Sequence, residues 1–370
     1  MSHPGKSQVS AVRSVLRLVA SLLCAVLVAV LAPSIAWAEK GGLRCEEVTF
    51  PVTLSPSDPT VYEVFGVLCS RGSVHNKTIQ VAIHGATYSH QYWDWPYQPE
   101  TYSYMRQATA AGYAVLAIDR IGIGQSDRPP AEEVTTASNA YVVHQIVQAL
   151  RGEELVVRAF GRIRADRVVL VGHSQGSITS IAEAATYGDV DGVVLTGLTH
   201  TLGPGVPELF ASLYPASLDP RFAGQSIPDG YLTTLPGTRD DSFFYHAPFF
   251  DPQVVALDEQ TKETVTAAEL GDAISAIFLS SGIHVPVLVV VGDYDRIFCA
   301  DPTCTASGTL TAEAAFYAPD ACAEIVAIPD AGHNLNLHFQ APLTYDVILE
   351  WMDRRVGSNP RVAPAQPCEP

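Results

Sequence analysis

Ser174 stands in a sequence context that is typical of an activated nucleophile. It lies in VVLVGHSQGSIT (168–179), where an apolar run ends in GHSQG. A sharp turn from a strand into a helix strains the backbone of the residue at its tip, and only small neighbours fit beside it. We therefore expect Ser174 at a sheet edge and at a helix N-terminus, where partial positive charge favours a developing anion. The alternative is a tight glycine turn with an inert serine.

A serine hydroxyl is a weak nucleophile until a base accepts its proton. The segment IPDAGHNLNLH supplies His333 on a loop shortly after the last predicted strand, at 324–328. His338 lies nearby in the run toward the final helix, and we expect it to be a packing or surface residue. His333 is therefore the predicted base.

A histidine base needs an acid that fixes its tautomer and stabilises its charged form. The segment VVVGDYDRIF offers Asp293 and Asp295 after a buried strand. We choose Asp295, because it lies two residues deeper in the loop and is freer to reach across. Asp293 is then expected to cap the turn, an ordinary role for aspartate.

The elements that must position these residues alternate along the chain. Near-continuous Val, Ile and Leu runs predict strands, and segments of helical spacing lie between them, which indicates an α/β fold with a mostly parallel sheet covered by helices on both faces. The predicted strands are 61–68, 78–85, 113–120, 167–174, 192–198, 285–293 and 324–328. The predicted helices are 102–111, 139–160 with an interruption near Gly152, 178–187 and 343–354. Such sheets carry their chemistry beyond the C-terminal ends of the strands.

Several motifs together resemble the α/β-hydrolase superfamily, in its lipase/esterase-like branch. They are IHGAT (83–87), DRIGIGQSDRP (119–129), GHSQG (172–176), GDYD (292–295) and AGH (331–333). The resemblance implies the α/β-hydrolase fold, and the order Ser174, Asp295, His333 matches the order of a triad on that fold. The motifs are specific for the fold and much less specific for the substrate.

The resemblance also implies an oxyanion hole and a reaction. Its donors are the backbone N–H of Gln175 and that of Ala86, with Thr87 as the second choice, while His84 shapes the turn. The implied reaction is acyl transfer from a small-molecule ester to water, with no cofactor and no metal. The loop residues Asp119, Gly122, Gly124 and Ser126 are expected to be structural.

Other reactions of this fold remain open at this point. Haloalkane dehalogenases and epoxide hydrolases of the fold use an aspartate at the elbow, so Ser174 argues against both. A peptidase or amidase of the proline-iminopeptidase type, a lactonase and an acyltransferase use the same serine elbow. A binding protein that has lost catalysis is also possible in this fold, although Ser174, Asp295 and His333 are all present.

The long segment between the strands ending near 198 and starting at 285 predicts an inserted cap. We expect the hydrolase core at 39–200 and 282–356, the cap at 201–281 and a proline-rich tail at 357–370. Aromatic residues in the cap, and others after the IHGAT motif, either line an apolar substrate pocket or only pack. The candidates for substrate binding are Thr87, Tyr92, Trp93, Phe244 and Tyr245.

The N-terminal segment predicts export. Lys6, Arg13 and Arg17 precede an apolar run (18–32), and the segment PSIAWA that follows it ends in Ala-Trp-Ala (36–38). We therefore expect residues 1–38 to be a signal peptide cleaved after Ala38. A membrane anchor is the rival interpretation, but the run is short for a span, which needs about 20 apolar residues. Removal leaves 19 basic and 39 acidic residues, a net charge of −20. That charge disfavours nucleic acid and anionic membranes as partners.

Export also changes what the cysteines mean. Six cysteines remain after position 38, and an even number in an oxidising compartment favours disulfides. Cys45 and Cys69 bracket a predicted hairpin and form our expected pair, while the partners of Cys299, Cys304, Cys322 and Cys368 stay open. No zinc-like spacing is present, so a metal site is not expected.

Overall fold

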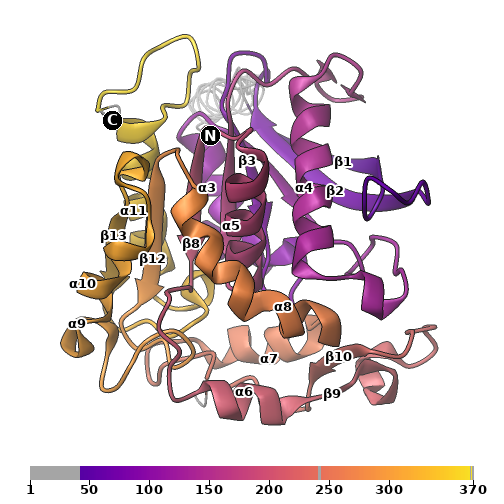
Figure 1. Cartoon of the computed structure of the whole chain (residues 1–370), viewed down its shortest axis with the longest axis vertical. Helices are drawn as coiled ribbons and strands as arrows, with labels where there is room; N and C mark the ends of the chain where they lie inside the picture. The colour runs from indigo at the N-terminus through magenta and orange to yellow at the C-terminus, as the bar shows by residue number, and fades with distance from the viewer. Residues whose placement is uncertain (1–41, 241–242, 367, 369–370) are drawn as a thin grey trace, which may run out of the picture. The chain divides into compact units, whose positions relative to one another are not determined.

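An eight-stranded sheet forms the centre of the computed structural model, which describes residues 42–240, 243–366 and 368 (Figure 1). The strand order is β1-β2-β4-β3-β7-β8-β12-β13. The strands are β1 (Leu43–Val52), β2 (Tyr62–Arg71), β3 (Ile79–Ile83), β4 (Ala114–Ile118), β7 (Val168–His173), β8 (Gly192–Thr196), β12 (Val287–Gly292) and β13 (Glu324–Ile328). β2 runs antiparallel to both of its neighbours, β1 and β4, and the other neighbouring strands of this sheet pair in parallel. The predicted mostly parallel sheet is therefore confirmed.

The central strands are short apolar runs because both faces of the sheet are covered. Every residue of β3, β4, β7, β8 and β12 is buried. β1, at the edge, instead alternates between exposed and less exposed residues. The near-continuous Val and Ile runs of the sequence are thus the strands that lie between two layers of helices.

The connections between strands decide which face each helix covers. The helices of these layers are α2 (Pro99–Tyr102), α3 (Tyr104–Ala110), α4 (Thr136–Arg151), α5 (Gln175–Tyr187) and α11 (Ala341–Arg355). The β3–β4 and β7–β8 connections step in opposite directions along the sheet, so right-handed crossovers place α3 and α5 on opposite faces. α4 packs against α5, and α11 packs against α3, which completes the two layers (Figure 1).

Two predicted helices differ in their limits from the observed ones. The helix expected at 102–111 is split at Ser103, whose side chain accepts a hydrogen bond from the Arg106 N–H and caps α3. The helix expected at 139–160 begins earlier, behind a capping box formed by Thr135 and Ser138. It ends at Arg151 because Gly152 has an extended backbone. A two-stranded ribbon follows, β5 (Val156–Val157) with β6 (Gly161–Arg162).

The chain between β8 and β12 adds a small sheet and several helices beyond the core (Figure 1). Of these, α8 packs against α4 and α5, and the rest lies beside the C-terminal ends of the parallel strands. The elements are α6 (Val206–Ser212), β9 (Leu213–Pro215), β10 (Tyr231–Thr234), α7 (Pro252–Thr261), β11 (Val265–Thr266) and α8 (Ala267–Ile277). Between β12 and β13 lie α9 (Cys304–Ser307) and α10 (Thr309–Glu313).

Three disulfides join cysteines of the described chain. Cys45 pairs with Cys69 across neighbouring positions of β1 and β2, which confirms the predicted pair. The pairs left open are Cys299–Cys304 and Cys322–Cys368. The predicted signal peptide, residues 1–38, lies outside the described residues. Within them, no helix combines the length and the apolar character that a membrane span requires.

Candidate active site

Ser174 occupies a strained turn between β7 and α5. Its φ of 52° and ψ of −118° are a conformation that residues other than glycine rarely adopt. A Cβ on Gly172 would lie 2.6 Å from the Gly176 carbonyl oxygen, and a Cβ on Gly176 would overlap the carbonyl oxygen of Ile83. Gly172 therefore allows the end of β7 to lie against the first turn of α5, and Gly176 allows that turn to approach the end of β3.

His333 is held by a carboxylate on the neighbouring strand end. Its Nδ1 lies 2.9 Å from Oδ2 of Asp295, and both side chains are buried. The other oxygen of Asp295 accepts the backbone N–H groups of Ile297 and Phe298, at 2.9 and 3.1 Å. Because the carboxylate accepts the Nδ1 proton, Nε2 of His333 is left as the basic nitrogen.

The other aspartate of the GDYD motif, Asp293, has a different partner from Asp295. Asp293 instead accepts the backbone N–H of Thr305 at 2.8 Å and so fixes the loop that follows β12. Ser174 and His333 line one common pocket, although they come from the ends of β7 and β13. The three predicted residues Ser174, Asp295 and His333 thus lie at one edge of the sheet.

His338 braces the loop that carries His333. Its Nε2 accepts the backbone N–H groups of Gly332 and His246, both at 3.0 Å, and its Nδ1 donates to the Asn334 carbonyl oxygen at 2.8 Å. This use of both ring nitrogens requires a neutral imidazole. Burial lowers the pKa of His338 to about 4, in agreement with that requirement.

Two other buried histidines near the site are also held in the neutral form. Burial and the positive charge of Arg120 lower the pKa of His84 to about 3, and His84 accepts the Arg120 backbone N–H at 3.1 Å. Burial and the neighbouring His333 lower the pKa of His173 well below its usual value. Among the described residues, neither ring is hydrogen-bonded to a carboxylate as His333 is, so both belong to the framework of the site.

Two backbone N–H groups next to Ser174 are available as donors. In the part of the chain that the structure describes, the amides of Ala86 and Gln175 have no protein acceptor, and both residues line the pocket beside Ser174. The Thr87 amide donates to the Thr264 carbonyl oxygen at 3.2 Å. This contact favours Ala86 over Thr87 as the second oxyanion donor.

A buried ion pair fixes the loop that carries Ala86. The Arg120 guanidinium pairs with Glu269 of α8, and both side chains are almost fully buried. It also donates to the carbonyl oxygens of His84, at 3.1 Å, and Gly85, at 3.4 Å. Glu269 further accepts Asn139 of α4 at 3.1 Å. The turn after β3 is thereby tied to the segment that follows β8.

A second buried ion pair lies on the other side of the same loop. Arg239 and Asp258 pair at 2.9 Å with no exposure of either side chain. Arg239 also donates to the Thr87 hydroxyl at 2.7 Å and stacks over the rings of Tyr88 and Phe244, 4.4 and 4.7 Å from their centroids.

This pair also connects to the His333 side of the site. Phe244 stacks against the His333 ring, with the centroids 5.8 Å apart and the planes 15° from parallel. Asp258 accepts the hydroxyls of Tyr88 and Tyr245, at 2.9 and 2.8 Å. The Arg239–Asp258 pair therefore supports both the loop after β3 that carries Thr87 and the ring that covers His333.

These supporting charges were not predicted from the sequence. Arg120 lies inside the motif DRIGIGQSDRP, where it could have been singled out as an arginine next to a buried strand. Arg239, Asp258 and Glu269 lie in the segment after β8 and belong to no motif. Their pairing depends on contacts between distant parts of the chain, which residue spacing does not reveal.

Two apolar pockets meet at Ser174. The larger, of about 70 Å³, is lined by Ala86, Ser174, Gln175, Ile178, Leu202, Val206, Leu209, Phe210, Leu270, Ala273, Ile274, Ile277, Ile297 and Phe298. The smaller, of about 30 Å³, is lined by Ala86, Thr87, Tyr88, Ser174, Leu209, Phe210, Leu213, Phe244, Val265, Leu270 and His333. Most of these residues come from the chain between β8 and β12.

The predicted substrate-binding residues fall into two groups. Thr87 and Phe244 line the smaller pocket at Ser174. Tyr92, Trp93 and Tyr245 line neither of the two pockets and are buried. Tyr92 stacks on the His173 ring, with 4.3 Å between the centroids, and so packs beneath the site rather than at its mouth.

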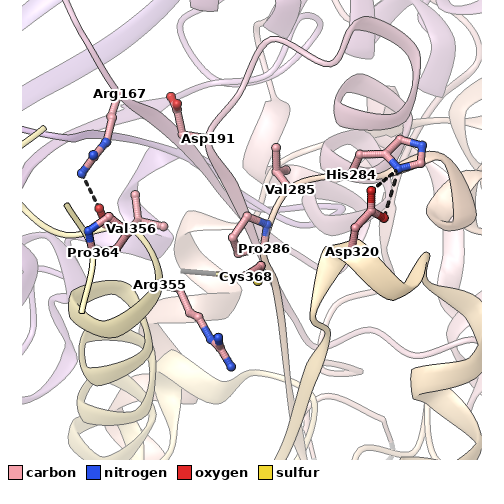
Figure 2. Close-up of a pocket in the computed structure, with 10 residues that line it drawn as sticks. All are labelled: Arg167, Asp191, His284, Val285, Pro286, Asp320, Arg355, Val356, Pro364 and Cys368. Carbon is pink, nitrogen blue, oxygen red and sulfur yellow. Dashed lines mark hydrogen bonds and ion pairs between the residues drawn. The ribbon is translucent and has the colours of Figure 1, made fainter. Parts of the chain in front are cut away.

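A more spacious pocket, of about 330 Å³, lies away from these residues (Figure 2). Arg167, Asp191 and Pro286 line it, and each immediately precedes a strand of the parallel sheet. The pocket therefore lies at the N-terminal edge of the sheet, opposite to Ser174. Size alone does not identify the reactive site here.

The comparisons with known proteins agree on one fold. A family model described as the alpha/beta hydrolase family matches residues 80–345. No curated protein matches the chain.

Solved structures that resemble the chain show low sequence identity. An esterase from Thermogutta terrifontis is 19% identical with a TM-score of 0.51, covering 82% of this chain and 98% of its own. A putative hydrolase from Rickettsia typhi is 12% identical with a TM-score of 0.53, covering 84% and 99%. A monoacylglycerol lipase from Paleococcus ferrophilus is 16% identical with a TM-score of 0.50, covering 84% and 98%. At these identities the likeness shows the fold alone.

Arg239→Met is expected to destabilise the protein by about 3–5 kcal/mol, because it leaves the buried Asp258 carboxylate unpaired. The control is Arg221→Met, whose partner Glu263 lies 3.1 Å away in a pair that is partly exposed on the arginine side. That change is expected to cost about 1 kcal/mol or less. Urea unfolding at pH 7 measures both, and equal losses would contradict the structural role of Arg239.

His338→Gln is expected to change how stability depends on pH. The folded pKa of His338, about 4, is below the usual 6.5, so its stabilising contribution is present above pH 6.5 and lost as the pH falls toward 4. The stability difference between wild type and variant should therefore shrink by about 3 kcal/mol between pH 7 and pH 4. Urea unfolding at several pH values measures it. His75→Gln, at an exposed position, should show no such change.

Proposed function

The chain belongs to the alpha/beta hydrolase family, and from this premise we propose that it is a serine hydrolase of carboxylic esters. Ser174 is the nucleophile, His333 the general base and Asp295 the acid that orients it. The observation that carries the proposal is that Ser174, on its strained turn, shares a pocket with His333, whose Nδ1 is bonded to Asp295.

In the proposed reaction, Ser174 Oγ attacks the ester carbonyl while Nε2 of His333 accepts its proton. The carbonyl oxygen becomes negative and receives hydrogen bonds from the backbone N–H groups of Gln175 and Ala86. His333 then protonates the leaving alcohol, and an acyl group remains on Ser174. Water, deprotonated by the same imidazole, attacks this acyl-enzyme and releases the acid and free Ser174.

Apolar lining supports an apolar ester as the substrate. Both pockets at Ser174 expose mainly aliphatic and aromatic side chains, and no acidic side chain lines either of them among the described residues. A peptidase that recognises a free amino terminus needs such a carboxylate, so the ester is favoured. Leu202, Phe210 and Ile274 are 49%, 50% and 45% exposed, which leaves an apolar entrance to the larger pocket.

The residues that line the two pockets at Ser174 also support a division of the chain into a core and a cap. Residues 201–281 form a cap that supplies most of the pocket walls, and residues 39–200 and 282–356 form the core that supplies the reacting groups. The proline-rich segment 357–370 is a tail.

We further infer that the protein is exported and cleaved after Ala38. The three disulfides are compatible with an oxidising compartment outside the cytoplasm. Sequencing the N-terminus of the exported protein tests the cleavage position.

Ser174→Ala is expected to lower kcat by about 10⁴-fold or more on p-nitrophenyl esters, because alanine has no hydroxyl that could attack the carbonyl. A series of esters from acetate to long acyl chains, assayed with wild type and variant, measures this. A fluorophosphonate probe should label only the wild type. Equal labelling of both proteins would contradict the assignment, and activity on aminoacyl amides with none on esters would favour a peptidase.

Ala273→Phe is expected to shift the preference toward short esters, because the new ring fills the larger pocket. The value of kcat/KM should fall about tenfold or more on esters with long acyl chains and change little on the acetate ester. A tenfold fall corresponds to an increase of about 1.4 kcal/mol in the activation free energy. Ala276→Phe is the matched control, since Ala276 lies on the same helix and lines a different pocket, between α8 and α4. An unchanged ranking in Ala273→Phe would contradict the pocket assignment.

A further inference from the structure

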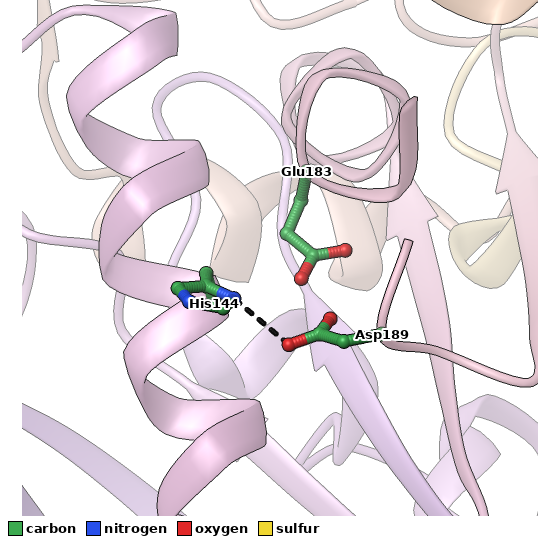
Figure 3. A group of neighbouring side chains, drawn as sticks. All are labelled: His144, Glu183 and Asp189. Carbon is green, nitrogen blue, oxygen red and sulfur yellow. Dashed lines mark hydrogen bonds and ion pairs between the residues drawn. The ribbon is translucent and has the colours of Figure 1, made fainter. Parts of the chain in front are cut away.

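A histidine and two carboxylates converge where the C-terminal part of α5 meets α4 (Figure 3). One potential ligand atom from each of His144, Glu183 and Asp189 lies within 4.8 Å of the others. The Nδ1 of His144 is 2.8 Å from Oδ2 of Asp189. The three residues come from α4, from α5 and from the turn that follows α5.

Glu183 is the unusual member of this group. It has no exposed surface, and neither of its carboxylate oxygens has a hydrogen-bond partner; Oδ1 of Asp189 also lacks one. Figure 3 shows the Glu183 carboxylate directed toward that of Asp189. A buried carboxylate without a donor is costly. Because the Glu183 carboxylate is buried beside that of Asp189 and no donor among the described residues reaches it, this position requires either a proton or a cation.

Neighbouring groups hold the three side chains in place. Gln148 donates to Oδ2 of Asp189 at 2.6 Å, and Arg151 donates to the Asp189 carbonyl oxygen at 2.9 Å. The ring of Tyr187 stacks on His144 at a centroid distance of 4.1 Å. The positive charge of Arg151 is partly neutralised by Asp191, 2.5 Å from its guanidinium. Such outer contacts are what orients ligands in metal sites.

We propose that His144, Glu183 and Asp189 bind a single divalent cation of the zinc type. One imidazole nitrogen and two carboxylate oxygens form a ligand set that suits Zn²⁺, and the imidazole narrows the choice against Ca²⁺ and Mg²⁺, which prefer oxygen ligands alone. The cation takes the place of the proton between the two carboxylates. All six cysteines after position 38 are in disulfides and do not compete for it.

The proposed site is structural and independent of ester hydrolysis. Glu183 lies nine residues after Ser174 on α5, about 13 Å along the helix axis at 1.5 Å per residue. A cation at this position links α4, α5 and the turn that leads into β8. Because these three elements come together only in the folded chain, the cation binds the folded state and stabilises it by mass action.

The test uses the exported, disulfide-bonded protein after removal of metals with EDTA. Isothermal titration with Zn²⁺ should show one site, and Zn²⁺ at about 100 times its Kd should raise Tm by a few degrees. Glu183→Gln keeps the size of the side chain and removes the charge, and it should weaken Zn²⁺ binding at least tenfold. Circular dichroism and urea unfolding of the variant establish that it is folded.

His284→Ala supplies the matched control. His284 also places its Nδ1 3.0 Å from an aspartate, Asp320, but this pair is exposed and has no second carboxylate in the described chain. The variant should bind Zn²⁺ as the wild type does. No binding at millimolar Zn²⁺, unchanged affinity in Glu183→Gln, a loss in His284→Ala, or tighter binding of Ca²⁺ than of Zn²⁺ would each overturn the proposal. None of these outcomes depends on the ester hydrolysis proposed above.

Discussion

The close approach of α5 to the end of β3 is the constraint on which the rest of the site depends. A side chain at Gly176 would overlap the carbonyl oxygen of Ile83, so only glycine allows these two segments to touch. Because they touch, the hydroxyl-bearing turn after β7 and the amide-bearing loop after β3 lie side by side. The strain at Ser174, with its φ of 52°, is the local cost of this contact, and the buried strands around it hold the turn in that conformation.

Buried charges then fix the loop after β3 from two sides. Arg120 with Glu269 holds its carbonyl groups, and Arg239 with Asp258 holds the Thr87 side chain. Each pair joins the loop, directly or through a neighbour, to the segment after β8. Buried ion pairs contribute little net stability compared with apolar packing, but breaking one is costly. Their effect here is to define one arrangement of the loop relative to that segment, and a fixed arrangement is what preorganised donors require.

The sequence predicted the positions at strand ends better than the contacts between elements. Ser174, Asp295 and His333 each follow a short apolar run, so strand periodicity and turn chemistry were sufficient to place all three at one edge of the sheet. Helix limits were less predictable, because Ser103 and Thr135 act through capping bonds that depend on local backbone geometry. Tyr92 looked like a pocket residue because it follows the IHGAT motif, yet it stacks on His173 beneath the turn, a contact that only the folded chain defines.

The two ends of α5 carry opposite chemistry, and the helix dipole accounts for both. Partial positive charge at its N-terminus lies at Ser174 and Gln175, where the proposed reaction develops an oxyanion. Partial negative charge at its C-terminus lies between Glu183 in the last turns and Asp189 just beyond the capping Gly188, whose φ is 60°. Two carboxylates at that end repel one another, and a bound cation would offset this repulsion. Under the two proposals, one helix would provide an anion-stabilising end for catalysis and a cation-binding end for stability.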